Sequence, residues 1–195
     1  KFQSENDDSF LPASVPGTVH LDLIKNGKID DPFFRLNEHE LQWIDKLAWN
    51  YKTSFNINDF HLEYDSIELD FLGLDTHADV FLNDHLIYSS NNMFVGKKIE
   101  VKQKIRRGNN NLFIKFKSPI NVGIEKYDKL GYELPDNAND LSEIGKVAGN
   151  KKVGVFLRKS PYSFGWDWGP RLVTSGIWRP IKVNFWNNFK ITDLH

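Results

Sequence analysis

Short stretches in which apolar and polar residues alternate constrain this chain more than any other feature. In residues 49–57 (WNYKTSFNI), Trp49, Tyr51 and Phe55 fall on one face, and polar residues fall on the other. Such a period of two is typical of a β-strand with one buried face. The same pattern occurs in residues 66–72, 110–118 and 179–186. The chain is therefore predicted to be rich in strands.

Turn and cap signals divide the remaining regular segments. Residues 78–89 form two short apolar stretches joined at Asn83-Asp84, and these residue types tolerate the positive φ of a tight hairpin. Helical patterns are few: residues 18–27 begin at a possible N-cap, Thr18, and residues 121–131 end at Gly131. Many strands and few helices predict an all-β, antiparallel jelly-roll β-sandwich with a few short helices. No linker or internal repeat divides residues 1–195, so one domain is expected.

Composition excludes several classes of site and partner. The chain has no cysteine, which excludes disulfides and thiolate metal sites, and its six histidines show no metal-binding spacing, so no metal and no cofactor are expected. A net charge of −1 gives no reason to expect a nucleic acid or an anionic membrane as partner. No apolar run approaches the roughly 20 residues of a membrane span. No nucleophile elbow, phosphate loop or recognisable catalytic carboxylate pair is present.

The most basic segment, residues 97–107 (KKIEVKQKIRR), has two interpretations. It can be a patch that binds polyanions, or the solvated face of an edge strand whose lysines discourage pairing with other chains. Ile99, Val101 and Ile105 keep strand spacing, and the chain as a whole is not basic. We therefore favour the edge strand.

A polar segment without a clear period, residues 132–152, leads to the most unusual motif, SFGWDWGPR at residues 163–171. Connections of that length in compact domains are usually functional or disordered. If the motif is extended, Phe164, Trp166 and Trp168 face one way and Asp167 faces the other, although the flanking glycines permit other geometries. The aromatic rings and the carboxylate suit sugar recognition. A tryptophan-rich core corner, with Asp167 paired to Arg171 or Arg158, is equally consistent with the residues.

The segment YSFGWDWGPRLVTSGIWRPIKV (residues 162–183) resembles the corresponding segment of the β-mannosidases of glycoside hydrolase family 2. Residues 15–45, 73–84 and 119–135 are similar to stretches of the same family and occur in the same order. The resemblance covers nearly the whole chain, and the combination of WDWGPR with GIWRP is specific.

This resemblance implies a galactose-binding-like, sugar-binding domain at the N-terminus of a longer retaining β-mannosidase. It implies that Trp166, Asp167 and Trp168 contact the terminal non-reducing β-D-mannose of a β-mannoside. The two catalytic glutamates would lie on a TIM barrel that is absent from this chain, so none is assigned here and the chain alone is expected to be inactive. The implied partners are β-mannoside saccharides and that barrel.

Two other functions stay open: a stand-alone carbohydrate-binding module and a purely structural docking domain. The compartment is not determined by the sequence; a bacterial parent would be periplasmic or extracellular, and an animal parent lysosomal.

Overall fold

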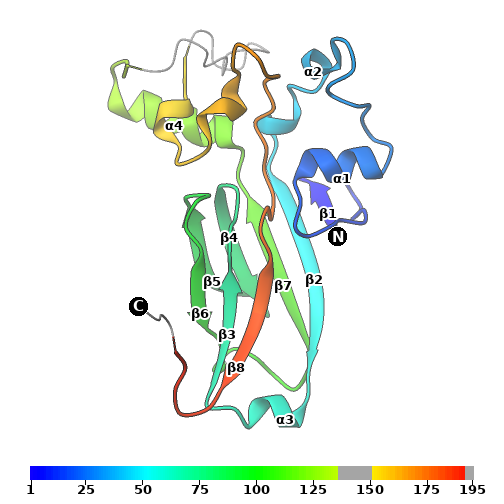
Figure 1. Ribbon diagram of the computed structural model, residues 1–195, viewed down its shortest axis with the longest axis vertical. Coiled ribbons are helices and arrows are strands. Elements are labelled where there is room, and N and C mark those ends of the chain that lie inside the picture. Colours follow the sequence, from blue (N-terminus) through cyan, green and yellow to red (C-terminus); the bar gives the residue numbers. More distant parts are fainter. Residues whose placement is uncertain (136–150, 192–195) are drawn as a thin grey trace.

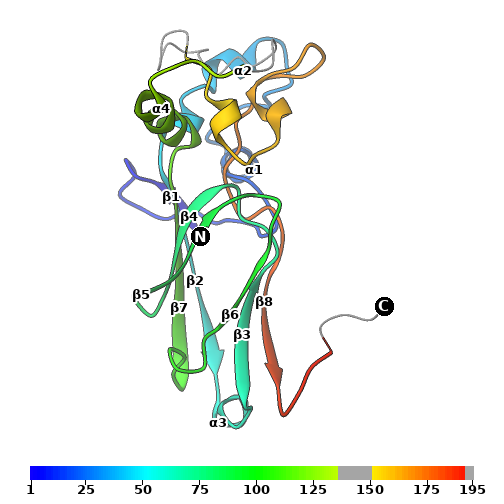
Figure 2. The same ribbon diagram turned by 90° about the vertical axis from the view of Figure 1, so that its left-hand side faces the viewer.

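The computed structural model describes residues 1–135 and 151–191, and its main body is a pair of antiparallel β-sheets that lie face to face (Figure 2). The strands within these residues are β1 (Phe2–Ser4), β2 (Trp49–Ile57), β3 (Ser66–Phe71), β4 (His77–Leu82), β5 (His85–Asn91), β6 (Lys97–Glu100), β7 (Gly108–Phe116) and β8 (Ile181–Trp186). One sheet has the order β1-β2-β7-β4-β5 and the other the order β6-β3-β8. The predicted all-β antiparallel fold is confirmed, whereas the jelly-roll connectivity stays a prediction.

Short helices gather mostly at one end of the sheets, and α3 lies at the other (Figure 1). Their bounds are α1 (Val19–Lys25), α2 (Asn37–Glu40), α3 (Asp59–Leu62) and α4 (Pro119–Leu130), with 3₁₀ turns η1 (Ile44–Lys46), η2 (Gly154–Phe156) and η3 (Pro161–Phe164). No helix in the described residues is long and apolar enough to cross a membrane.

Strand β2 shows how the alternating pattern produces the sandwich. It pairs with β7 along its whole length, from Trp49 opposite Phe116 to Ile57 opposite Gly108. Trp49, Tyr51 and Ile57 are buried in the main core, because every second side chain points to the same face. The strand predicted for residues 49–57 is confirmed, as are those at 66–72, 110–118 and 179–186.

The predicted hairpin is also confirmed. Strands β4 and β5 are joined by Asn83 and Asp84, whose φ angles are 47° and 68°. Positive φ at both positions is the geometry of the tight turns that match the twist of paired strands.

The edge-strand prediction for residues 97–107 is right only in its first part. Strand β6 is an edge strand but ends at Glu100, and the chain then turns, with the Ile105 N–H donating to the Val101 carbonyl at 2.9 Å. Both apolar side chains are buried in this turn. The spacing of Val101 and Ile105 fits a strand, but it does not exclude a turn, because positions four residues apart also meet on one side of a helical turn.

The sequence indicated the start of α1 and the end of α4, whereas α1 ends at Lys25, before the predicted stop at residue 27. Thr18 Oγ1 accepts the Leu21 N–H at the start of α1, and α4 ends at Gly131, whose φ of 77° favours glycine. Helix α4 begins at Pro119, two residues before the predicted start, after the N-cap Ser118. Of the polar segment predicted to be functional or disordered, residues 136–150 lie outside the described residues.

The core has two parts. The larger part fills the space between the sheets, and a smaller cluster lies under α4 and consists of Ile120, Val153, Leu157, Phe164 and Val173. The smaller cluster takes side chains from both sides of the WDW motif, so it anchors the segment on which the candidate site depends.

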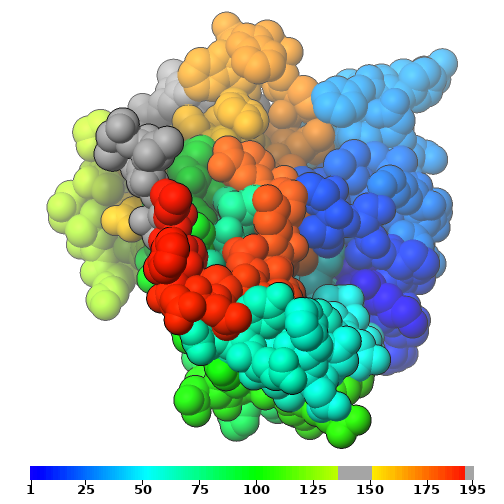
Figure 3. Space-filling model, turned by 60° about the horizontal axis from the view of Figure 1, so that its bottom comes forward, coloured from blue at the N-terminus to red at the C-terminus, as the bar shows by residue number. Residues whose placement is uncertain are grey.

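At the opposite end of the molecule, the residues after β8 (red) lie against the segment that contains α3 (cyan) in Figure 3. There the Asn188 N–H donates to Asp65 Oδ2 at 2.9 Å.

Candidate functional site

The WDWG motif forms a tight turn. The Gly169 nitrogen lies 3.4 Å from the Trp166 carbonyl oxygen, to which it donates. Trp168 is 76% exposed, Asp167 is also exposed, and Trp166 is half-buried. The extended geometry, in which Phe164, Trp166 and Trp168 share one face, is wrong, because the chain reverses here and Phe164 is buried in the core under α4.

Gly165 makes this change of direction possible. It follows η3 and has a φ of 111°, in a region that side-chain-bearing residues rarely adopt. The alternative interpretation as a core corner is wrong for Asp167 and Trp168, since both are exposed, and Arg171 is buried and bound to other groups. The motif therefore presents an indole and a carboxylate on the surface.

These two side chains line one side of a shallow hollow of about 310 Å³. The other side is formed by the segment between α1 and α2, which contributes Phe33 and Arg35, and by α2, which contributes Glu38. Phe33 is 72% exposed, so both segments contribute an aromatic ring to the hollow, and both also contribute charged side chains. An open surface of this composition can stack on the C–H face of a pyranose and bind its hydroxyls with charge-assisted hydrogen bonds.

A buried ion pair holds the C-terminal side of the turn. Arg171 is 1% exposed, and its Nη1 donates to Asp45 Oδ2 at 2.5 Å and to the side-chain oxygen of Gln42. The Gln42 Nε2 donates in return to the Arg171 carbonyl at 3.0 Å. Burial raises the pKa of Asp45, and the adjacent guanidinium opposes that rise. The residue that ends the WDWGPR motif is thus fixed to η1 and to the segment before it.

A second buried ion pair holds the N-terminal side. The Lys159 Nζ lies 2.6 Å from Asp75 Oδ1 and donates also to Thr174 Oγ1 at 3.0 Å. Thr174 Oγ1 in turn donates to Asp75 Oδ2 at 2.7 Å. Burial lowers the pKa of Lys159, and the neighbouring Asp75 opposes this effect. The three residues join the segment before the turn, the segment after it, and the loop between β3 and β4.

His20, in the first turn of α1, lies close enough to both pairs to experience their charge. It is 6% exposed, and burial together with the positive charge of Lys159 lowers its pKa to about 4. Its Nδ1 is buried and has no hydrogen-bond partner among the described residues. His20 is therefore neutral at physiological pH and contributes no further charge to this interior.

The structure brings all three predicted site residues into one turn, but they are not equivalent. Asp167 and Trp168 project at the hollow, and Trp166 forms the half-buried base of the turn. Among residues 1–135 and 151–191, no group of three or more histidine or acidic side chains could hold a metal ion.

Sequence reasoning missed the side of the hollow contributed by residues 32–38. The signal there was the pair Phe33-Phe34 in a segment without strand or helix periodicity, since adjacent aromatic residues outside such a pattern have no core face to occupy. It also missed the buried pairs, because Lys159 and Asp75 are 84 positions apart in the chain.

Three relatives show what the chain resembles. It is 32% identical over 178 residues to β-mannosidase of Mus musculus, covering 91% of this chain and 20% of that protein. It is 35% identical to β-mannosidase B of Thermothelomyces thermophilus, over 97% of this chain and 21% of that one. The crystal structure of β-D-mannosidase from Dictyoglomus thermophilum matches with a TM-score of 0.89 and 40% identity, over 98% of this chain and 22% of that chain.

The chain therefore spans about a fifth of the length of the β-mannosidases that it matches. The model of the family described as "Glycosyl hydrolase 2 galactose-binding domain-like" matches residues 1–179, which include the larger sheet, the hollow and the anchored turn. With a match over that much of its length, the chain belongs to the galactose-binding-like domain family of the glycosyl hydrolase 2 enzymes.

Proposed function

We propose that this chain is the sugar-binding domain of a longer β-mannosidase and forms one wall of the pocket for a terminal, non-reducing β-D-mannose. The observation that carries the proposal is the exposed pair Asp167 and Trp168, presented on a turn whose two sides are fixed by buried ion pairs. An exposed indole gains nothing from core packing, whereas anchoring of its backbone suits a surface that must hold a ligand in one geometry.

The chemistry assigned to the two side chains is binding and orientation. The Asp167 carboxylate would accept hydrogen bonds from two sugar hydroxyls, and the Trp168 ring would cover the C–H face of the pyranose. Holding the sugar in a fixed orientation lowers the barrier for groups that react with it, even when the holding residues form no bonds themselves. In the whole enzyme, two glutamates outside this chain would carry out retaining hydrolysis.

The surface around the turn supports a second part of the proposal, that the catalytic barrel packs against this end. Phe34, Leu36 and Tyr162 are 57%, 71% and 58% exposed there, in addition to Phe33 and Trp168. Apolar side chains that are exposed together, next to polar groups, mark a surface that another domain covers. The hollow would then be one half of a pocket, completed by the barrel.

The substitution Asp167→Ala in the full-length enzyme tests the proposal. Loss of a charged hydrogen bond to substrate should lower kcat/KM for a β-mannoside by a factor on the order of 10 to 1,000. The control is Asp59→Ala, which removes an exposed carboxylate in α3 at the opposite end of the domain and should leave kcat/KM unchanged. Equal activity of the two variants would mean that this domain only docks and that Asp167 is dispensable.

A titration of the 195-residue chain distinguishes the stand-alone module. Because the hollow is open and shallow, the chain should bind mannose or mannobiose weakly or not detectably, as monitored by NMR shifts of the tryptophan indole N–H groups. Micromolar binding by the chain alone would show a complete sugar site and favour a carbohydrate-binding module.

A further inference from the structure

The chain that leaves β5 runs beside the segment that leads into the WDW turn. Asn92 forms a parallel β-bridge with Arg158, and the Met93 N–H donates to the Arg158 carbonyl at 3.0 Å. Met93 is 7% exposed, so its side chain is buried where these two segments meet. It is therefore placed to hold the residues that precede the turn.

The thioether of Met93 accepts hydrogen bonds from Ser160, the N-cap residue of η3. The Ser160 N–H donates to Met93 Sδ at 3.1 Å, and the Ser160 hydroxyl donates to the same sulfur at 3.5 Å. Ser160 is also buried. Because a buried N–H without an acceptor is costly, the sulfur holds Ser160 in place even though a thioether is a weak acceptor.

From Ser160 the constraint passes to the turn through short, local links. Pro161 follows directly, and its ring fixes the backbone φ at the first position of η3. The Ser163 N–H donates to the Ser160 carbonyl at 3.1 Å. The Gly165 N–H then donates to the Tyr162 carbonyl at 3.2 Å, and Gly165 is where the chain changes direction into the WDW motif. A displacement of Ser160 would therefore displace the turn.

Met93 is itself fixed by the second motif, GIWRP at residues 176–180. The Trp178 Nε1–H donates to the Met93 carbonyl at 3.0 Å. The same indole packs so closely on Gly73 that an added Cβ there would lie 2.6 Å from Nε1. Trp178 and Arg158 thus hold the main chain of Met93 from two segments, and the position of the sulfur follows from them.

We propose that Met93 is a positioning residue for the sugar: its sulfur fixes the start of η3 and thereby the place of Asp167 and Trp168 on the turn. This role rests on the proposed function, because it concerns the same two exposed side chains. The ion pair of Lys159 with Asp75 holds the neighbouring residue from the loop between β3 and β4, and Met93 adds a contact from the end of β5. A small misplacement of a group that holds substrate is enough to slow a reaction.

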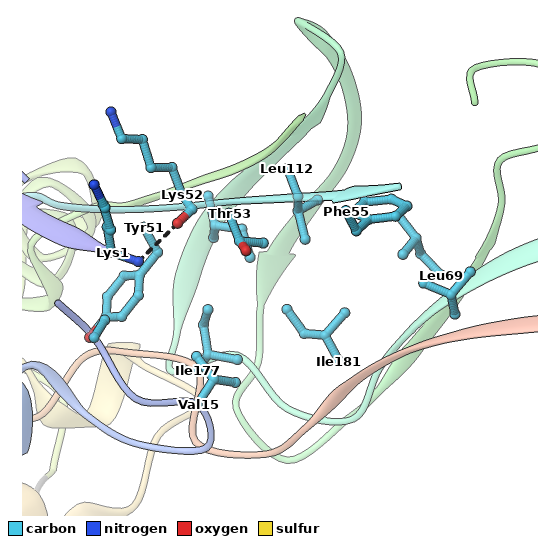
Figure 4. A pocket seen from close by; sticks show the side chains of 13 residues that line it. Lys1, Val15, Tyr51, Lys52, Thr53, Phe55, Leu69, Leu112, Ile177 and Ile181 are labelled. Carbon is cyan, nitrogen blue, oxygen red and sulfur yellow. Dashed lines mark hydrogen bonds between the residues drawn. The ribbon is translucent and has the colours of Figure 1, made fainter. Parts of the chain in front are cut away.

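The substitution Met93→Leu in the full-length enzyme tests this role, because leucine keeps the apolar volume but has no acceptor. It should lower kcat/KM for a β-mannoside about tenfold. The control is Leu69→Val in β3. Leu69 is 1% exposed and lies beside Phe55 at the hollow of about 430 Å³ between the two sheets (Figure 4). This variant should lower the urea midpoint of unfolding and leave kcat/KM unchanged.

A double-mutant cycle determines whether Met93 acts through the turn. In a chain that carries Asp167→Ala and Trp168→Ala, Met93→Leu should lower kcat/KM by less than about twofold, because the groups that it positions are gone. Met93→Gln alone, which returns an acceptor oxygen on an unbranched side chain, should recover part of the activity that Met93→Leu loses. A tenfold effect of Met93→Leu that persists without the two side chains would overturn the proposal.

Hydrogen–deuterium exchange tests the anchoring apart from activity. In Met93→Leu the amides of Ser160 and Gly165 should exchange at least about fivefold faster, and those of β2 should not change. If Asp167→Ala lowers kcat/KM but Met93→Leu leaves kcat/KM and exchange unchanged, the positioning role is overturned and the proposed function stands. If Asp167→Ala leaves kcat/KM unchanged, the proposed function fails and exchange alone decides: faster exchange supports the anchoring by Met93, and unchanged exchange overturns it.

Discussion

His20 makes the stability of this domain depend on pH in a predictable direction. Its pKa is about 4 in the folded chain, against an ordinary value of about 6.5 in an unfolded one. Between these two values the unfolded state binds a proton that the folded state does not, so the free energy of unfolding falls as pH falls. Above the unfolded-state pKa, His20 does not lower the free energy of unfolding, and below pH 4 the loss of free energy that it causes is complete.

The magnitude follows from the two pKa values. Between pH 7 and pH 5, His20 alone should lower the free energy of unfolding by about 2 kcal/mol. The charged groups that face it, Lys159, Asp75 and Arg171, come from three separate segments, and Lys159 has the largest effect among them. Other groups also titrate in this range, so the contribution of His20 is the difference between the wild type and a variant.

The assay is urea unfolding followed by tryptophan fluorescence at pH 7 and pH 5. His20→Asn should be less stable than the wild type at pH 7 but should lose about 2 kcal/mol less than the wild type on acidification. His85→Asn, at an exposed position in β5, should retain the wild-type loss. The reasoning is refuted if His20→Asn also retains it, or if the His20 ring nitrogens titrate near pH 6.5 in the folded chain by NMR.

Two further substitutions test the packing that supports the site. Lys159→Met leaves the buried Asp75 carboxylate without its ammonium partner and should destabilise the chain by about 3–5 kcal/mol in urea unfolding. As a control, Arg107→Ala removes one partner of an exposed ion pair and should change stability by less than about 0.5 kcal/mol. Similar losses for both would show that burial does not matter here. Gly123→Ala would place a Cβ 2.6 Å from Val153 Cβ. The resulting strain of about 1–3 kcal/mol should exceed the gain in helix propensity, so the urea midpoint of unfolding should fall. Adding Val153→Ala to the same chain should partly restore the midpoint. If Gly123→Ala proves as stable as the wild type, that result contradicts the close packing of α4 on η2.

The strands were predictable because their information is local. Alternation with a period of two predicted β2, β3, β7 and β8, and Asn83-Asp84 predicted the hairpin, since a turn of that kind depends on its own two residues. The same local rule failed at Val101 and Ile105, where spacing of four residues fits a turn as well as a strand.

The support of the site was not predictable, because it depends on contacts between distant segments. Arg171 meets Asp45 across 126 positions of the chain, and no periodicity indicates which of 26 acidic residues a buried arginine will bind. The motif itself identified Trp166, Asp167 and Trp168 as candidates. Its shape could not be predicted, because the backbone freedom of Gly165 permits this turn but also permits other geometries.

In this turn, the residues that hold the backbone in place are different from the residues that are exposed at its tip, whereas in most binding sites the same residues do both. The rigidity of the turn resides in buried groups on either side, Lys159 and Arg171, whereas the tip, Asp167 and Trp168, is exposed and contributes little to folding. Substitutions at exposed positions usually alter stability by no more than about 0.5 kcal/mol. The tip can therefore be varied, by evolution or in a mutant library, without a compensating change elsewhere in the domain, so the proposed sugar contact can change independently of the fold.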